Sequence, residues 1–121
     1  LFAALTGWTG ENEKNDALSV HVKGVKRATE ALQRATAWLA QHGLANPNDA
    51  GAGAYDYMRL MGITVLALMW GQMAKASIGK DDALHKDKLM CARYWMERMV
   101  PECPMLLERI QAGSAVVMEL S

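Results

Sequence analysis

The chain has 121 residues, 51% of them hydrophobic, and its 13 basic and 13 acidic side chains leave no formal net charge. This length is enough for one domain with a buried core, and the zero charge balance argues against a nucleic-acid binder, which needs surplus cations to neutralise phosphates. Two cysteines are too few for a disulfide framework, so we expect a reducing compartment, the cytoplasm.

Residues 1–16 lack a helical pattern of apolar positions along their whole length. They open with a short apolar stretch, contain Gly7 and Gly10, and end in a polar cluster at residues 11–15. Glycine and clustered polar residues favour turns and loops. We therefore predict a loop, or a frayed segment, that leads into the first long helix.

The first long helix is predicted over residues 17–42. Asp16 is a favourable N-cap residue, and Gly43 is typical of the position just after a helix end. Between them, apolar or small residues recur in steps of four and three, the helical period, at Leu18, Val22, Val25, Thr29, Leu32, Thr36 and Leu39. The stretch 46–53, rich in asparagine, glycine and alanine, is predicted to be a loop.

The second helix is predicted over residues 54–78 and should be the central one. Its residues 60–74 carry no charge, and their apolar side chains would lie on every face of a helix. This run is shorter than the ~20 residues that cross a bilayer, so we expect other protein to surround it. Small residues should let a neighbouring helix come close, namely Gly62, Ala67, Gly71 and Ala74.

Two further helices are predicted over residues 82–100 and 102–120. A break at residues 79–81 contains a glycine and an aspartate that can cap the next helix, and Pro101 disfavours helical geometry in the residue before it. No segment sustains the apolar–polar alternation of a strand. The pattern predicts an all-α fold, an antiparallel up-down four-helix bundle.

Five residues are expected to have structural roles. Arg59 lies one turn into an otherwise apolar helix, so it should be buried or half-buried and paired with Asp56 or with a carboxylate of helix 82–100. Pro101 should redirect the chain between two packed helices. The other three are expected to serve helix packing: Gly62, Trp70 and Trp95.

The sequence indicates no catalytic, cofactor-binding or metal-binding residue. The three histidines are isolated, and even His85, which has Asp82 and Asp87 nearby, is interpreted as a surface residue. Cys91 and Cys103 lack Cys-x-x-Cys spacing, so we expect buried, unreactive thiols. The residues by themselves suggest a module that takes part in assembly.

Several segments, in this order and spacing, resemble a known family. Residues 54–74 read AYDYMRLMGITVLALMWGQMA, residues 92–102 read ARYWMERMVPE, and residues 106–113 read LLERIQAG. Together with the preceding stretch 29–39, they resemble the extra domain at the C-terminus of certain acyl-CoA dehydrogenases. The resemblance covers about residues 20–120.

The resemblance implies a parent enzyme that uses FAD to oxidise an acyl-CoA to a 2-enoyl-CoA. In that family the flavin site, the thioester pocket and the catalytic glutamate belong to upstream catalytic domains, so no such residue is carried over to this chain. For the chain itself the resemblance implies a non-catalytic helical domain that packs on those catalytic domains and supports a homodimer. In relatives that act on long chains, the appended region also helps to hold the enzyme at a membrane.

Two other functions stay open on the sequence alone. A membrane-surface module would use the basic flank of helix 17–42, which consists of Lys23, Lys26, Arg27 and Arg34. A bundle acting alone would instead enclose a small apolar ligand in an internal pocket, lined by Met58, Met61, Met69 and Met96.

Overall fold

The computed structural model describes residues 1–120, and every regular element in that range is helical. The prediction of an all-α fold is confirmed. Two short segments are a 3-10 turn, η1 (Asp16–Leu18), and a π-helical turn, η2 (Trp95–Met99). The α-helices are α1 (Phe2–Asn12), α2 (Ser19–Ala45), α3 (Pro47–Ser77), α4 (Ala83–Tyr94), α5 (Glu102–Gln111) and α6 (Ala115–Leu120).

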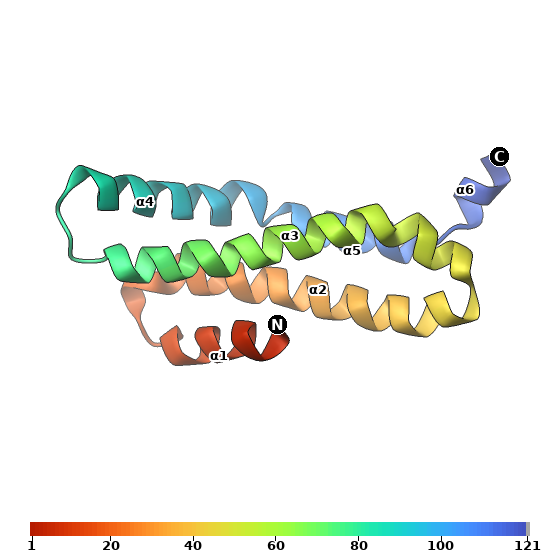
Figure 1. Cartoon of the computed structure of the whole chain (residues 1–121), viewed down its shortest axis with the longest axis horizontal. Coiled ribbons are helices and arrows are strands. Elements are labelled where there is room, and N and C mark those ends of the chain that lie inside the picture. The colour runs from red at the N-terminus through yellow and green to blue at the C-terminus, as the bar shows by residue number, and fades with distance from the viewer. Residues whose placement is uncertain (121) are drawn as a thin grey trace.

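The two longest helices, α2 and α3, lie antiparallel along the molecule (Figure 1). α4, η2 and α5 follow one another beside α3, so that they act as one long, interrupted element. α1 packs against α2 and is much shorter than it, and α6 projects from one end. The predicted up-down bundle of four helices is not confirmed, because the predicted helices 82–100 and 102–120 continue in one direction as α4, η2 and α5 instead of running antiparallel to each other.

The structure has a helix, α1, where the sequence predicts a loop over residues 1–16. Leu5, Trp8 and Asn12 follow one another at helical spacing, and all three are buried. The Asn12 side-chain amide donates to the carbonyl of Trp8 at 2.8 Å, which satisfies a polar group inside the packed face. This narrow face, to which the buried Thr9 also belongs, is enough to hold the helix because α2 supplies a surface to pack on.

α3 begins at Pro47, whereas the sequence predicts a loop up to residue 53. The side chain of Asn46 accepts a hydrogen bond from the backbone N–H of Asn48 at 3.1 Å, and Pro47 takes the first helical position, where a missing N–H is harmless. The corner between α2 and α3 is tight: a Cβ placed on Gly43 would lie 3.1 Å from the Cβ of Ala50. The small residues of this stretch thus permit close helix packing instead of forming a loop.

Glycine breaks the helical path at two places. Gly79 has a φ of +82°, which glycine adopts readily, and it lies in the break predicted at residues 79–81. Gly113 has a φ of +73° and divides the predicted helix 102–120 into α5 and α6. Beyond it, the N–H and hydroxyl of Ser114 donate to the Oδ1 of Asp49 at 2.8 and 2.6 Å, which ties the turn to the first turn of α3.

The π-helical turn η2 lies just before Pro101. The N–H of Val100 donates to the carbonyl of Trp95 at 3.0 Å, five residues back instead of four. Pro101 has no N–H to donate, and α5 begins at the next residue. The α-helical hydrogen bonding is therefore interrupted where the sequence places the break, but Val100 and Pro101 keep helical backbone angles, so the chain continues through a wider coil.

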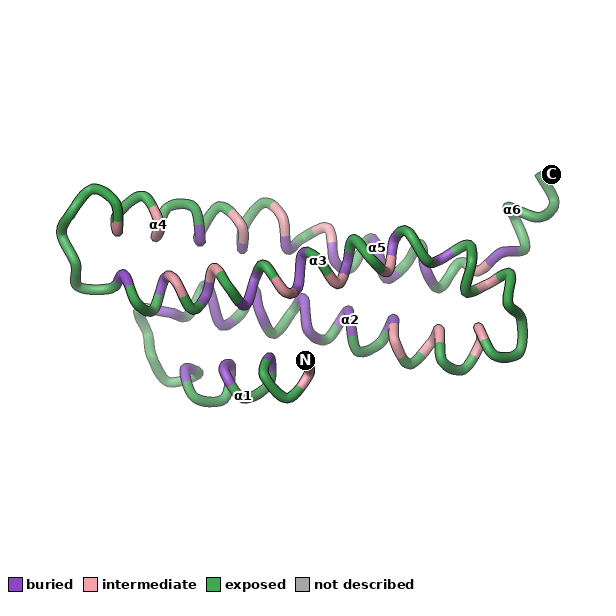
Figure 2. The backbone as a smooth tube through the Cα atoms, in the orientation of Figure 1, coloured by how far each residue is buried: buried purple, intermediate pink, exposed green. Residues whose placement is uncertain are grey.

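The core runs along the interface of α2 and α3 and is closed by α1 on one side and by α4, η2 and α5 on the other. Figure 2 shows the buried positions of these helices facing one another. Even the polar Thr64 is fully buried, because its hydroxyl donates to the carbonyl of Leu60 at 2.8 Å. The largest apolar side chains without solvent contact are Leu5, Leu18, Val25, Leu32, Leu60, Val100, Leu106 and Ile110.

Candidate functional site: an apolar face of α3

α3 presents two different faces over residues 55–69. The inner face is buried against α2, α5 and α4, at positions such as Leu60, Ile63 and Ala67. The outer face stays open to solvent although it carries large apolar side chains. We call it the α3 face, and it consists of Tyr55 (74% exposed), Met58 (64%), Gly62, Leu66 (40%) and Met69 (48%).

These residues form one stripe because they follow one another in steps of three and four. The expectation that other protein surrounds residues 60–74 on every side is wrong within this chain, since Leu66 and Met69 are exposed. The reason is the number of neighbours: α2 and the α4–η2–α5 element cover the inner face, and α1 reaches only one more side. A contiguous row of exposed apolar side chains is typical of an interaction surface.

A groove of about 380 Å³ runs along the α3 face. Its second wall comes from η2, whose Trp95 and Met99 face the helix. The indole N–H of Trp95 donates to the carbonyl of Ile63 at 3.1 Å, so the ring is held in place against α3. The groove is thus a fixed feature of the surface, made from two elements that are far apart in sequence.

Arg59 lies at the edge of this groove and is paired, but not with the predicted partner. Its Nε and Nη2 both donate to Oε1 of Glu102, at 2.9 and 2.8 Å, and Glu102 belongs to α5. The bond to this carboxylate raises the pKa of Arg59 above its ordinary value. The side chain is 42% exposed, more open than expected, and Asp56 pairs with Arg109 instead, at 3.2 Å. Arg59 therefore places a fixed charge beside the apolar stripe.

The other predicted packing residues have separate positions. Gly62 makes no close helix contact, since a Cβ there would meet nothing within 4 Å, and it lies on the open face. Gly71 makes the close contact instead, because a Cβ there would lie 2.7 Å from the indole of Trp8. Trp70 is half-buried against the core. Pro101 is exposed and marks the turn between η2 and α5.

The sequence pattern does not reveal the α3 face. Tyr55, Met58, Leu66 and Met69 belong to a stretch in which most residues are apolar, so hydrophobicity cannot separate the two faces. Arg59 is no decisive signal either, because an arginine can be buried when it is paired, and its partner Glu102 comes near only in the fold.

Reactive side chains do not converge on the α3 face or elsewhere in residues 1–120. No group of three or more His, Cys, Asp or Glu in that range could hold a metal ion. Burial raises the pKa of the Cys103 thiol to about 11, so it stays protonated, as expected for an unreactive cysteine. Cys91, in contrast, is exposed. His21 is buried rather than on the surface, and neither of its ring nitrogens has a hydrogen-bond partner.

The four methionines considered for an apolar ligand are dispersed. Met58 and Met69 are exposed on α3, whereas Met96 is buried on the opposite side of η2. A search of residues 1–120 finds no helix with the length and apolar character needed to span a membrane.

An all-helical fold with an open apolar face is typical of an accessory domain that packs on other protein. The chain belongs to the family described as acetyl-CoA dehydrogenase C-terminal like, whose sequence profile matches residues 2–121. A comparison with curated proteins found no match. The family assigned by resemblance in the sequence analysis is thereby confirmed, and the match extends to the first helix, which that resemblance did not cover.

Proposed function

We propose that this chain is a non-catalytic domain that packs through the α3 face on the upstream catalytic domains of an acyl-CoA dehydrogenase. That enzyme would use FAD to oxidise an acyl-CoA to the 2-enoyl-CoA, as a homodimer that this domain supports. The family match supports the kind of parent enzyme. The observation that carries the packing role is the row of Tyr55, Met58, Leu66 and Met69, large apolar side chains that stay exposed along one side of α3.

The composition of the α3 face suits contact with protein. Its centre is apolar and includes an aromatic and two methionine side chains, residue types enriched in protein interfaces. Arg59 is already bonded to Glu102 at the edge, so burying the face does not leave an isolated charge without a partner. The free thiols Cys91 and Cys103 agree with a reducing compartment, and the proposal includes a cytoplasmic enzyme.

The test uses the natural polypeptide that contains this chain, with the double substitution Met58→Asp/Leu66→Asp. Both side chains are exposed here, so the fold of the helical domain should persist while two charges enter the contact. We expect a lower melting temperature of the whole enzyme, a smaller particle in light scattering, and retained circular dichroism at 222 nm. Bound FAD and acyl-CoA oxidation by the unsubstituted enzyme test the nature of the parent.

The matched control is Leu44→Asp, at the end of α2, where the side chain is 89% exposed and far from the α3 face. This variant should keep the melting temperature and particle size of the unsubstituted enzyme. The packing role is refuted if Met58→Asp/Leu66→Asp behaves like Leu44→Asp. The catalytic part of the proposal is refuted if the natural polypeptide contains no flavin.

A further inference from the structure

A second groove lies on the other side of the π-helical turn, between α2 and the junction of η2 with α5. Its volume is about 570 Å³. The floor and walls are largely apolar, and they consist of Val20, Gly24, Met96, Val100 and Pro101. This groove shares no lining residue with the one along the α3 face, so it is a separate feature of the surface.

The floor of the groove depends on a close approach between η2 and α2. A Cβ on Gly24 would lie 2.4 Å from the sulfur of Met96, so only glycine lets the methionine lie on the helix backbone. Met96 is buried, and Val100, one turn further along the chain, has no solvent contact. The apolar surface at the bottom of the groove is therefore held in place.

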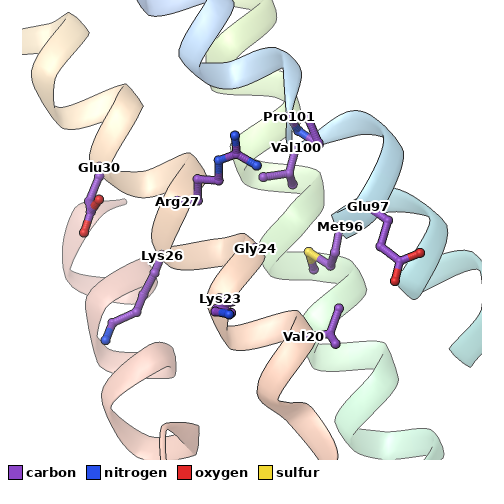
Figure 3. A pocket seen from close by; sticks show the side chains of 10 residues that line it. All are labelled: Val20, Lys23, Gly24, Lys26, Arg27, Glu30, Met96, Glu97, Val100 and Pro101. Atoms are coloured by element: carbon purple, nitrogen blue, oxygen red, sulfur yellow. The ribbon is translucent and has the colours of Figure 1, made fainter.

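Two cations stand at the rim without a partner. Lys23 and Arg27 lie on the same side of α2, four residues apart, and both line the groove. Within residues 1–120, neither forms an ion pair or a side-chain hydrogen bond. Figure 3 shows the guanidinium of Arg27 directed toward Val100 and Pro101, across the groove.

The remaining charged residues of the groove are directed or paired elsewhere. Lys26 bonds to Glu13 at 2.7 Å, on the side of α1, and Glu30 points to that side as well (Figure 3). Glu97 on the opposite wall bonds to Arg93 at 2.8 Å. The charge left available to a ligand is thus positive, and it stands above an apolar floor.

We propose that this groove binds an amphiphilic anion, a small molecule with an alkyl chain and a carboxylate, sulfate or phosphate head group. The alkyl chain would lie on Val20, Pro101 and the exposed edge of Met96, and the head group would lie between Lys23 and Arg27. The groove volume falls in the range of roughly 300–1,000 Å³ that is usual for small-molecule sites. Its length along α2, from Val20 to Arg27, is about 10 Å, too short for a protein interface.

The test is calorimetric titration of the 121-residue chain with decanoate below its micellar concentration. Decanoate should bind, whereas decyltrimethylammonium, with the same chain length and the opposite charge, should not. In NMR spectra of methyl-labelled methionine, the Met96 signal should shift and those of Met58 and Met69 should not. Lys23→Glu/Arg27→Glu should weaken decanoate binding about tenfold, because two partly screened attractions become repulsions.

Lys75→Glu/Lys86→Glu is the matched control, since it makes the same change in net charge at exposed lysines outside the groove. It should bind decanoate as the unsubstituted chain does. Val20→Trp, which fills the groove without changing its charge, should also weaken binding. Equal binding of both amphiphiles, equal loss in the control, or a shift at Met58 instead of Met96 would overturn the proposal. Binding to phosphatidylglycerol vesicles without binding of decanoate would assign the cations to a membrane surface and overturn it too.

Discussion

Gly62 and Gly71 belong to the same uncharged stretch of α3, yet their surroundings are opposite. A Cβ on Gly71 would lie 2.7 Å from Cη2 of Trp8, whereas one on Gly62 would meet nothing within 4 Å. Gly71 therefore leaves the space that a side chain of α1 fills, and Gly62 lies in the middle of a surface that no residue within 1–120 covers. A glycine in an apolar helix thus marks either a close contact or a contact that another molecule would complete.

Removal of Trp8 is the largest change that this comparison predicts. Trp8 is buried between α1 and α3, so Trp8→Ala should lower the free energy of unfolding by about 3 to 5 kcal/mol. Urea unfolding followed by circular dichroism measures this. A loss below about 1 kcal/mol, the range of surface substitutions, would mean that α1 contributes little to the fold.

Gly71→Ala should be the next most destabilising. The added methyl group would collide with a rigid indole ring, and overpacking of this kind costs about 1 to 3 kcal/mol in the free energy of unfolding. The same substitution in a Trp8→Ala background should cost much less, since the colliding ring is then absent. Equal costs in both backgrounds would contradict the assigned contact.

Gly62→Ala should stabilise the chain, whereas Gly71→Ala should destabilise it. An exposed glycine inside a helix costs about 0.5 to 1 kcal/mol relative to alanine, so the free energy of unfolding of the chain should rise by that amount. Thermal unfolding of the chain alone provides the measurement. In the natural polypeptide, a smaller gain or a loss would show that another part of the protein packs closely on the α3 face.

His21 should have the smallest effect of these residues on the free energy of unfolding at neutral pH, and this effect should grow in acid. Burial, and the nearby charge of Arg93, lower the pKa of His21 in the folded chain. The unfolded chain therefore takes up a proton more readily, and the free energy of unfolding should fall as pH drops below about 6.5. His21→Leu should flatten this dependence between pH 7 and pH 5. An NMR titration that finds an ordinary pKa for His21 would refute the explanation.

The course of α2 and the break before α4 could be predicted from the sequence because each rests on a local signal. The periodic spacing of Leu18, Val25 and Leu32 places one stripe in the core, and all three are fully buried. The Gly79 break is equally local, since its positive φ suits glycine. The start of α3 also has a local signal, because Asn46 followed by Pro47 is typical of a helix start. The glycines and alanines after Pro47 led instead to the prediction of a loop.

The open face of α3 and the helix α1 could not be predicted, because both depend on which elements pack together. Leu60 and Leu66 are both leucines in one uncharged stretch, and only the position of α2 and α5 makes the first buried and the second exposed. Trp8 and Gly71 form a contact across more than half of the chain, which no local pattern encodes. The candidate site is of this second kind, so its residues emerged only from the fold.

The π-helical turn has a further consequence for the architecture. The hydrogen bond from Val100 to Trp95 encloses one residue more than an α-helical turn, and this extra residue sets the rotation of α5 about its own axis. Deleting a single residue there would rotate α5 by roughly 100° about its axis. Cys103, Leu106 and Ile110 would then swing out of the interior, and Glu102 would leave Arg59. The one extra residue in this turn therefore keeps the apolar side of α5 directed at the core that α2 and α3 form.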